Sequence, residues 1–322
     1  MASSACTTSM CCRPRKVAIL TFSGAVHVCS DVGFVGLGTM GGRMAERLQQ
    51  AGHRLVVYNR SVDKSAPFAA RGARIAKQPA EVTKNCHVVV SCLLDDAAVK
   101  EVYLGANGLL THATERHVFV EHGTFSPEVR SQIADRASLV GATFLDAPVT
   151  GGPEGARAGT LITMVGGVES ATDQVRSLML EYSSDVVHLG DGGAGLRLKL
   201  INQFLVTTHV VSAAIGVNLL RSTGLPVEES ARVLDGGWAA STMLRRAFDA
   251  ERNQDNSSCG APISALISVS GPIASELASA GIDGNFFAAA KEILTQAAEG
   301  SDVGVDVSRL SAHLEMAGNQ HD

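Results

Sequence analysis

The stretch Gly36-Leu37-Gly38-Thr39-Met40-Gly41 determines the fold. It follows a β-branched apolar run, Val32–Val35, which we predict to be a strand. It opens a stretch with helical periodicity, Met40–Ala51, which is followed by a typical C-cap residue, Gly52. A strand that enters a glycine-rich turn and leaves it as a helix is the context of a dinucleotide fingerprint. A glycine-rich turn in some other α/β protein is the alternative.

Each glycine of such a fingerprint has its own role. The first permits the tight turn, the second lets the backbone approach a pyrophosphate, and the third allows close packing of helix on strand. The helix N-terminus supplies N–H groups to the phosphates. We therefore predict that these six residues bind a dinucleotide cofactor.

The residues after the second predicted strand, Leu55–Tyr58, favour NADP over NAD. NAD-binding domains usually carry an acidic residue here, which binds the ribose 2′-hydroxyl. This chain has Asn59-Arg60-Ser61 instead, and an arginine can pair with a 2′-phosphate through two N–H groups. We predict that these three residues contact NADP, with NAD also possible. Arg60 as an ordinary exposed loop residue is the alternative.

Short β-rich runs alternate with helical stretches from Asp31 to Gly190, which predicts a parallel, doubly wound sheet. The helices expected after the first are Ala97–Leu104 and Pro127–Val140. The remaining predicted strands are Val88–Leu93, Val118–Glu121, Thr143–Leu145, Leu161–Val165 and Val186–Leu189.

After Gly190 the strand signal ends, and a glycine-rich hinge, 191–195, leads into a long apolar helix that continues to about Leu220. We predict an N-terminal extension (1–30), a nucleotide-binding α/β domain (31–193) and an all-α domain (194–322). A loop is expected over Asp249–Ser258. The other predicted helices are Val227–Leu234, Ser241–Phe248, Ile263–Ser279, Phe286–Ala298 and, weakly, Val307–Met316.

The long helix opens with Gly195-Leu196-Arg197-Leu198-Lys199-Leu200-Ile201-Asn202. Residues three apart share a helix face, so Lys199 and Asn202 project together. A cation in an apolar run needs a compensating role. We predict that Lys199 is a proton donor and that Asn202 orients it. A lysine that extends to the rim of a packed helix is the alternative.

The composition of the chain limits the classes of partner that it is expected to bind. The chain has 322 residues, 45% of them hydrophobic, so two domains are expected. A formal charge of -5 and 4% aromatic residues offer neither a basic surface nor stacking platforms, so nucleic acid is not an expected partner. The chain has seven cysteines, an odd number, and the four in the first thirty residues lack metal-ligand spacing, so we expect a reducing compartment and no metal site.

Residues 1–30 contain no acidic residue and carry Arg13, Arg15 and Lys16, a composition typical of an organellar transit peptide. A plain cytosolic extension and a secretory signal are the alternatives. The apolar run Val17–Cys29 is too short to span a bilayer, and no apolar run of sufficient length is expected elsewhere. We expect no membrane anchor and a mitochondrial or cytoplasmic location.

Two further strand ends carry candidate substrate contacts. Thr150, Gly151 and Gly152 follow a strand, where backbone N–H groups can converge on an anion, although the bare sequence indicates only a turn. Thr124 follows the strand Val118–Glu121, at the sheet edge where ligands bind in open α/β folds. It is therefore a candidate contact to nicotinamide or substrate. The neighbouring His122 is more often structural than a base.

Together these motifs resemble the β-hydroxyacid dehydrogenase family from about Asp31 to Ser241. The resemblance also rests on Gly159-Thr160-Leu161, Met164-Val165-Gly166-Gly167 and Gly236-Gly237. It implies a Rossmann-type domain followed by an all-α domain, with a long inter-domain helix that carries a catalytic lysine. It also implies a homodimer or homotetramer.

The resemblance assigns roles to residues of this sequence. Lys199 looks like the family's acid/base residue, Asn202 like its substrate-holding companion, and Thr124 like a contact to cofactor and substrate. Asn59-Arg60-Ser61 is similar to the NADP-using semialdehyde and glyoxylate reductases, which implies reduction of a small carboxylate substrate. The other implied contacts are Thr150, Gly151 and Gly152 to that carboxylate, and Leu93 and Leu94 to the cofactor.

Three departures from the family pattern matter. Gly123 stands where a serine is common, and Ile215 where an acidic residue is usual. A segment that normally ends in a Lys-Asp pair near the cofactor is missing, because Phe248 leads through 249–258 almost directly to Gly260. A catalytically silent NADP-binding protein for interaction or sensing is therefore the alternative function.

Overall fold

The computed structural model describes residues 31–253, 261–299 and 305–318. All of the described residues belong to one unit of the chain, Asp31–Asp322. The predicted extension, and the loop residues 254–258, therefore lie outside the described residues. The predicted boundary near residue 193 falls inside this unit and stays a prediction.

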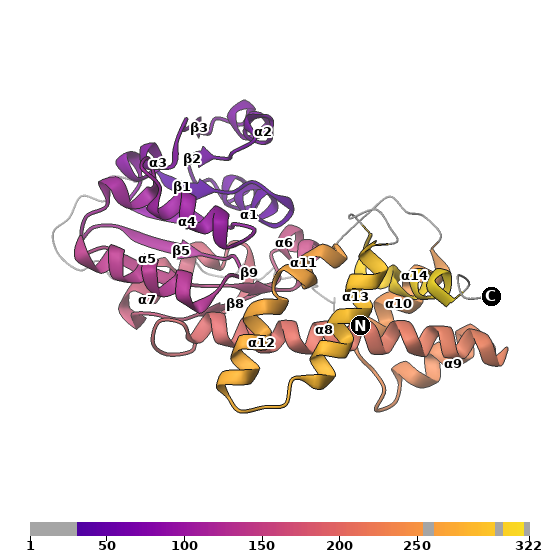
Figure 1. The fold of residues 1–322 in the computed structure, drawn as a ribbon. Helices are drawn as coiled ribbons and strands as arrows, with labels where there is room; N and C mark the ends of the chain where they lie inside the picture. The colour runs from indigo at the N-terminus through magenta and orange to yellow at the C-terminus, as the bar shows by residue number, and fades with distance from the viewer. Residues whose placement is uncertain (1–30, 254–260, 300–304, 319–322) are drawn as a thin grey trace, which may run out of the picture. The chain divides into compact units, whose positions relative to one another are not determined.

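Six parallel strands form the main sheet in the order β3-β2-β1-β4-β5-β6 (Figure 1). This order confirms the predicted doubly wound sheet. The order reverses beside β1, and ligands of such folds bind next to that point, at the carboxyl ends of the strands. The strands are β1 (Val32–Val35), β2 (Leu55–Tyr58), β3 (Arg74–Ile75), β4 (Val88–Ser91), β5 (Val118–Glu121) and β6 (Thr143–Asp146).

Helices cover both faces of this sheet, which is why its strands read as continuous apolar runs. One core cluster contains Met44 and Leu48 of α1, and the other contains Val82 of α3 and Ile133 of α5. The short elements β3, α2 and α3 were not predicted from the sequence. The helices are α1 (Thr39–Gln50), α2 (Ala66–Ala70), α3 (Pro79–Asn85), α4 (Asp96–Leu104) and α5 (Pro127–Leu139), with the 3₁₀ helices η1 (Val62–Ser65) and η2 (Leu109–His112).

A second, smaller sheet follows the first, in the order β7-β8-β9. The strands predicted at Leu161–Val165 and Val186–Leu189 are present as β8 (Leu161–Val165) and β9 (Ser183–His188), but they belong to this sheet and not to the main one. β7 (Val149–Thr150) pairs with β8 in antiparallel orientation. The helices of this part are α6 (Gly152–Ala158) and α7 (Glu169–Met179).

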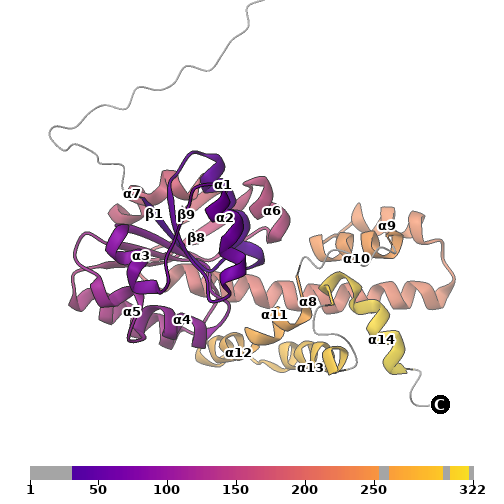
Figure 2. The same ribbon diagram turned by 90° about the horizontal axis from the view of Figure 1, so that it is seen from above.

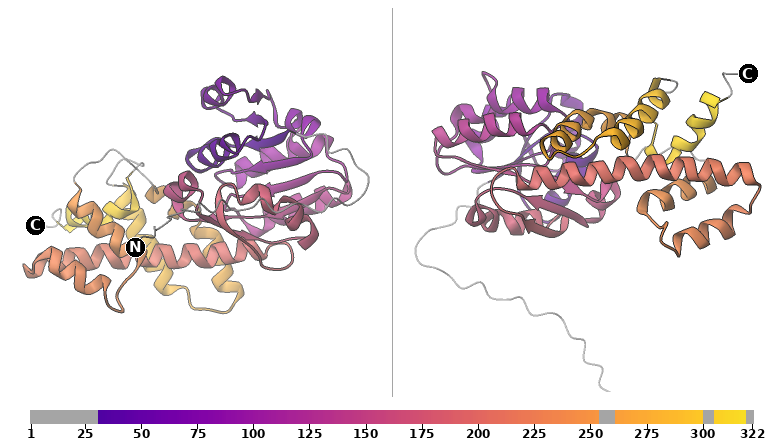
Figure 3. Two further views of the ribbon diagram at one scale, coloured as in Figure 1. Left: turned by 180° about the vertical axis from the view of Figure 1, so that it is seen from behind. Right: turned by 60° about the horizontal axis from the view of Figure 1, so that its bottom comes forward.

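The long predicted helix is α8 (Ala194–Thr223), which has 30 residues. It contacts β6 and β8 near its start and α10, α12, α13 and α14 further along (Figure 3). By length and composition α8 could cross a membrane, so the expectation that no apolar run is long enough was wrong. The core helix of a globular domain meets the same criterion, and 44% of the most apolar window of α8 is buried.

The C-terminal part is helical, as predicted (Figure 2). The helix predicted over Ile263–Ser279 is interrupted at Val269, and the start of the predicted loop, Asp249 to Arg252, continues α10. The remaining elements are α9 (Val227–Asp235), α10 (Thr242–Arg252), α11 (Ile263–Ser268), α12 (Ser270–Ser279), α13 (Asn285–Glu299), η3 (Val307–Arg309) and α14 (Leu310–Gly318).

The start of α8 approaches the second sheet so closely that residue 195 must be glycine. A Cβ atom on Gly195 would lie 2.7 Å from the carbonyl oxygen of Asp146 and 2.9 Å from the backbone nitrogen of Gly166. These are backbone atoms, which cannot move aside as a flexible side chain can. Gly216, in the same helix, has no such neighbour within 4 Å.

We predict that Gly195→Ala lowers the free energy of unfolding by about 1–3 kcal/mol, because the added methyl group overpacks this contact. The matched control, Gly216→Ala, should raise it by about 0.5–1 kcal/mol through better helix propensity. Urea unfolding followed by circular dichroism measures both. Equal effects of the two substitutions would contradict the close approach.

Candidate active site

Lys199 is half-buried one turn into α8, at the carboxyl edge of the main sheet. Loss of hydration lowers the pKa of its ammonium group to about 8, and the nearby Cys92 after β4 partly opposes this shift. The group can therefore exchange a proton near neutral pH.

Two residues predicted to hold the substrate, Thr150 and Asn202, contact each other one turn beyond Lys199 on α8. The hydroxyl of Thr150, at the end of β7, donates to Oδ1 of Asn202 on α8 at 3.5 Å. The Asn202 amide nitrogen in turn donates to Oε1 of Gln203 at 3.1 Å. The structure thus brings Thr150 and Asn202 together, although they lie in different parts of the chain.

Gly151 and Gly152 form the turn from β7 into α6, with φ of +124° and +67°. Glycine adopts such positive φ values without strain. Because α6 begins at Gly152, the N–H groups of its first turn have no partner within the helix. The turn beside Thr150 therefore offers backbone donors to an anion.

The fingerprint glycines fall into two classes. A Cβ atom on Gly41 would collide with the carbonyl oxygen of Gly36, and one on Gly36 with that of Cys92, so the fold itself requires both. Gly38 has an ordinary φ of -71° and no atom within 4 Å of its Cβ position. The fold itself therefore does not require glycine at residue 38, and the open space leaves room for a pyrophosphate to approach the backbone.

The three predicted residues after β2 behave differently from one another. Oδ1 of Asn59 accepts from the backbone N–H of Leu37 at 2.8 Å, and its amide nitrogen donates to the carbonyl of Ser61 at 2.9 Å. Asn59 therefore holds the glycine turn in place. Arg60 is exposed at the carboxyl end of β2, without an ion-pair partner in the described part of the chain.

The loops after β4 and β5 are joined by a buried carboxylate that the sequence analysis missed. Oε1 of Glu121 accepts from the backbone N–H of Gly123 at 2.7 Å and of Leu93 at 3.1 Å. Leu93 lies beside Gly36, Leu94 is exposed, and Thr124 is half-buried after Gly123. The only signal was an acidic residue at the end of an apolar strand.

Gly123, which replaces the family's common serine, is explained by this junction. A Cβ atom there would lie 2.6 Å from the carbonyl oxygen of Leu93 and 2.7 Å from Oε1 of Glu121. The loop geometry of this chain therefore excludes a side chain at residue 123.

A second missed carboxylate fixes the start of α8. Asp146, at the end of β6, is fully buried and accepts from the backbone N–H of Gly193 at 2.6 Å and of Leu196 at 2.9 Å. Arg130 of α5 donates to it through Nε at 3.1 Å. Burial raises the pKa of this carboxyl, and the two N–H groups and the guanidinium oppose the shift. Asp146 thus positions the helix turn that carries Lys199.

His122 is structural, as the sequence favoured. Its Nδ1 lies 2.5 Å from the carbonyl oxygen of Ala147, and its Nε2 lies 2.9 Å from the hydroxyl of Tyr182. Burial lowers the pKa of the imidazole to about 4. Both nitrogens are in use within the protein, so His122 is not a candidate base.

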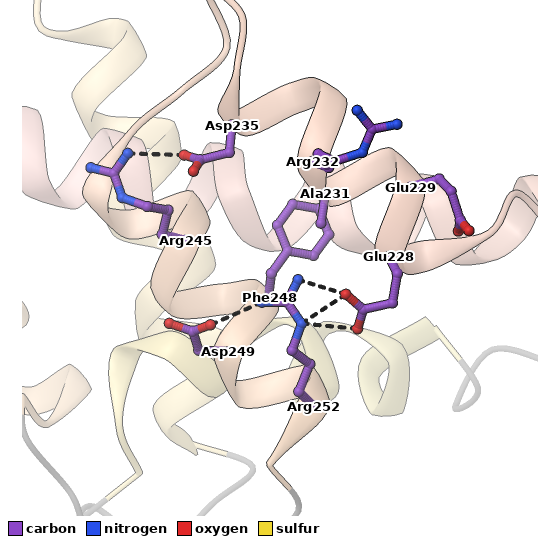
Figure 4. Close-up of a pocket in the computed structure, with 9 residues that line it drawn as sticks. All are labelled: Glu228, Glu229, Ala231, Arg232, Asp235, Arg245, Phe248, Asp249 and Arg252. Atoms are coloured by element: carbon purple, nitrogen blue, oxygen red, sulfur yellow. Dashed lines mark hydrogen bonds and ion pairs between the residues drawn. The ribbon is translucent and has the colours of Figure 1, made fainter.

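A cavity of about 430 Å³ lies elsewhere, between α9 and α10, and contains none of the predicted site residues (Figure 4). Five of its seven charged side chains form ion pairs with one another. Arg252 pairs with Glu228 and Asp249 at 2.9 and 3.0 Å, and Arg245 pairs with Asp235 at 2.9 Å.

We predict that Gly38→Ala weakens dinucleotide binding by about tenfold or more, because its methyl group enters the space where backbone and pyrophosphate approach. Its unfolding free energy should stay close to that of the wild type. Gly41→Ala is the contrasting variant, in which unfolding itself becomes easier. Fluorescence titration and thermal unfolding separate the two effects, and unchanged affinity in Gly38→Ala would exclude this cradle.

The comparisons with known proteins agree with this geometry. Residues 31–190 match the NAD binding domain of 6-phosphogluconate dehydrogenase. Psf3, solved in complex with NADP+ and 2-OPP, superposes with a TM-score of 0.79 over 88% of this chain and 99% of its own. At 24% identity this likeness shows the fold alone.

Two sequence relatives carry the family assignment. The mitochondrial 3-hydroxyisobutyrate dehydrogenase of Mus musculus is 35% identical over 206 residues, which are 64% of this chain and 62% of that enzyme. This chain therefore matches less than two thirds of the mouse protein. The probable mitochondrial 3-hydroxyisobutyrate dehydrogenase of Dictyostelium discoideum is 35% identical over 68% of this chain and 70% of its own length. The predicted resemblance is thus confirmed, and the chain belongs to the β-hydroxyacid dehydrogenase family, among relatives of the 3-hydroxyisobutyrate dehydrogenase type.

Proposed function

We propose that the protein is an NADP-dependent oxidoreductase that interconverts a small semialdehyde acid and its β-hydroxyacid, with Lys199 as general acid and base. The observation that carries the proposal is the half-buried Lys199 ammonium, with its pKa lowered to about 8, on the helix face next to the Thr150–Asn202 pair. The names of the mouse and Dictyostelium relatives support this substrate class.

Lys199 supplies the proton that the reaction needs. The nicotinamide, when bound, provides or takes up the hydride. The carbonyl oxygen gains an electron pair as its carbon is reduced, and the Lys199 ammonium donates a proton to it. In the opposite direction the neutral amine removes a proton from the hydroxyl. A positioned acid or base of this kind contributes about 10²–10⁴-fold in rate.

The substrate carboxylate is assigned to the turn beside Lys199. The Thr150 hydroxyl and the backbone donors at Gly151 and Gly152 are suited to an anion. The Asn202 amide, which contacts Thr150 and Gln203, can turn a donor towards substrate. Thr124 approaches from the loop after β5. Leu93 and Leu94 are assigned to the cofactor side.

NADP is favoured by Arg60. Its exposed guanidinium follows β2 at the carboxyl edge of the sheet, where a ribose 2′-phosphate is bound in this fold type. Asn59 supports the assignment only indirectly, because its side chain holds the glycine turn.

A homodimer or homotetramer is part of the proposal. α8 has an exposed apolar stripe whose side chains are 38–64% accessible. Exposed apolar side chains that gather on one helix face favour an interaction site there. The stripe consists of Leu198, Ile201, Leu205, Ile215 and Leu219.

We place the protein in mitochondria or the cytoplasm. The composition of residues 1–30 agrees with a transit peptide, and the mouse and Dictyostelium relatives are named mitochondrial.

A catalytically silent NADP-binding protein is the second candidate. The missing Lys-Asp segment favours it, because in this chain α10 ends at Arg252 and α11 already begins at Ile263. The lowered pKa of Lys199 favours the enzyme, since a binding module gains nothing from a desolvated cation. Turnover of NADPH with glyoxylate, succinic semialdehyde, methylmalonate semialdehyde or tartronate semialdehyde distinguishes the two.

We predict that Lys199→Met lowers turnover by about 10²–10⁴-fold and leaves NADPH affinity nearly unchanged, because only the proton donor is removed. Initial rates from NADPH absorbance, together with fluorescence titration, measure the two properties. Lys100→Met, an exposed lysine on α4, is the matched control and should retain the full rate. Retention of more than about a tenth of the activity in Lys199→Met would contradict the role.

The wild-type pH profile provides a second check on Lys199. Reduction needs the ammonium form, so its rate should fall as pH rises through about 8. Oxidation needs the amine and should rise over the same interval. Both limbs should disappear in the residual activity of Lys199→Met.

We predict that Arg60→Ala raises the dissociation constant of NADPH by about tenfold and hardly changes that of NADH, because only NADPH carries the 2′-phosphate. Parallel fluorescence titrations with the two cofactors provide the measurement. An equal loss for both would show that Arg60 shapes the loop and does not read the phosphate.

A further inference from the structure

Glu121 is a fully buried acidic residue with no role in the proposed proton transfer. It ends β5 and reaches across to the end of β4. Oε1 accepts two backbone N–H groups, from Leu93 at 3.1 Å and Gly123 at 2.7 Å, and Oε2 accepts from the Ser91 hydroxyl at 2.5 Å.

The hydrogen bonds around Glu121 favour its ionised form, in opposition to burial, which raises the pKa of this carboxyl. The Tyr103 hydroxyl lies 2.6 Å from the Ser91 oxygen, so a chain of hydroxyl donors runs from Tyr103 through Ser91 to Oε2. With two N–H groups on Oε1, every contact of the carboxyl group is one it accepts. Three donors to one carboxylate stabilise its charged form, against the burial that raises its pKa.

No cation neutralises this charge directly. Within residues 31–253, 261–299 and 305–318, no arginine, lysine or histidine forms an ion pair with Glu121. Asp146, at the next strand end, has Arg130 at 3.1 Å. The negative charge of Glu121 therefore remains at the carboxyl edge of β4 and β5, where the surrounding protein screens it weakly.

The charge lies in the cluster that contains the predicted cofactor contacts. Cys92 follows Ser91 and lies against the start of the fingerprint helix α1. A Cβ atom added to Gly41 of that helix would lie 3.1 Å from the Cβ atom of Cys92. Burial and the Glu121 charge raise the pKa of the Cys92 thiol to about 12, and Lys199 opposes this shift. Glu121 and Lys199 thus act on the same thiol beside the glycine turn.

We propose that Glu121 makes the site select the oxidised cofactor, whose nicotinamide ring carries a positive charge, over the reduced cofactor, whose ring is neutral. The inference rests on the proposed function and deepens it. A fixed negative charge attracts a cation and has little effect on a neutral ring of the same shape. By linkage, a site that binds NADP+ better than NADPH also favours the reduction of substrate on the enzyme.

The test substitutes the charge and keeps the hydrogen bonds. In Glu121→Gln the amide oxygen can still accept from Leu93 and Gly123, and its nitrogen can donate to Ser91. Dissociation constants of the full-length protein for NADP+ and NADPH are measured by equilibrium titration at one pH. We expect the NADP+ constant to rise by about tenfold and the NADPH constant to change by less than about twofold.

The matched control is Tyr103→Phe, which disturbs the same donor chain and leaves the carboxylate charged. Its ratio of the two constants should equal that of the wild type. Equal weakening of both cofactors in Glu121→Gln would show that Glu121 only shapes the loops, and an unchanged ratio would overturn the proposal. If the wild-type protein binds neither NADP+ nor NADPH, the proposed function itself is contradicted.

A second variant covers a failure of Glu121→Gln to fold. Lys199→Met removes the opposing positive charge from the cluster and leaves Glu121 in place. This variant should prefer NADP+ over NADPH more strongly than the wild type does. If the ratio of the NADPH to the NADP+ dissociation constant in Lys199→Met does not exceed the wild-type ratio, the selection by Glu121 is overturned.

Discussion

The contact between the Asp146 carboxylate and the first turn of α8 is the constraint on which the site depends. The carboxylate ends β6 and accepts two N–H groups that the helix cannot satisfy internally, at Gly193 and Leu196. The positive end of the helix dipole adds to the attraction. Arg130 completes the coordination and lowers the cost of burying the charge. Everything that α8 carries is positioned from this point.

The chemistry of Lys199 follows from that positioning. Because α8 begins against the sheet edge, the ammonium group of Lys199 loses water, and its pKa falls to about 8. The close approach is possible only because Gly195 has no side chain. The packing that requires glycine at residue 195 therefore also removes water from the Lys199 ammonium group. Glu121 holds the loops after β4 and β5 in a similar way. It accepts hydrogen bonds from loop backbone N–H groups, whereas Asp146 accepts them from the end of a helix.

The sequence predicted what depends on local pattern. The fingerprint, five of the six strands of the main sheet (all but β3) and the long helix follow from periodicity, and the helices α4 and α5 from their capping residues Asp95 and Ser126. The separate small sheet was missed because pairing of β7 with β8 depends on contacts across a helix and not on either strand alone. The roles of Glu121 and Asp146 could not be predicted, since their partners, Leu93 and Gly193, are far away in sequence. The direct role of Asn59 in holding Leu37 was hidden for the same reason.

The shared start of α8 also limits how this architecture can be recombined. A cut at the hinge between 190 and 194 separates Asp146 from Gly193 and Leu196, and leaves a buried anion with Arg130 alone. In a chimaera that takes its helical part from a relative, Asp146 must therefore be kept. The incoming helix must also begin with glycines at the positions of Gly193 and Gly195. The segment that can be exchanged as one piece therefore ends inside α8, beyond Leu196, and not in the loop that follows β9.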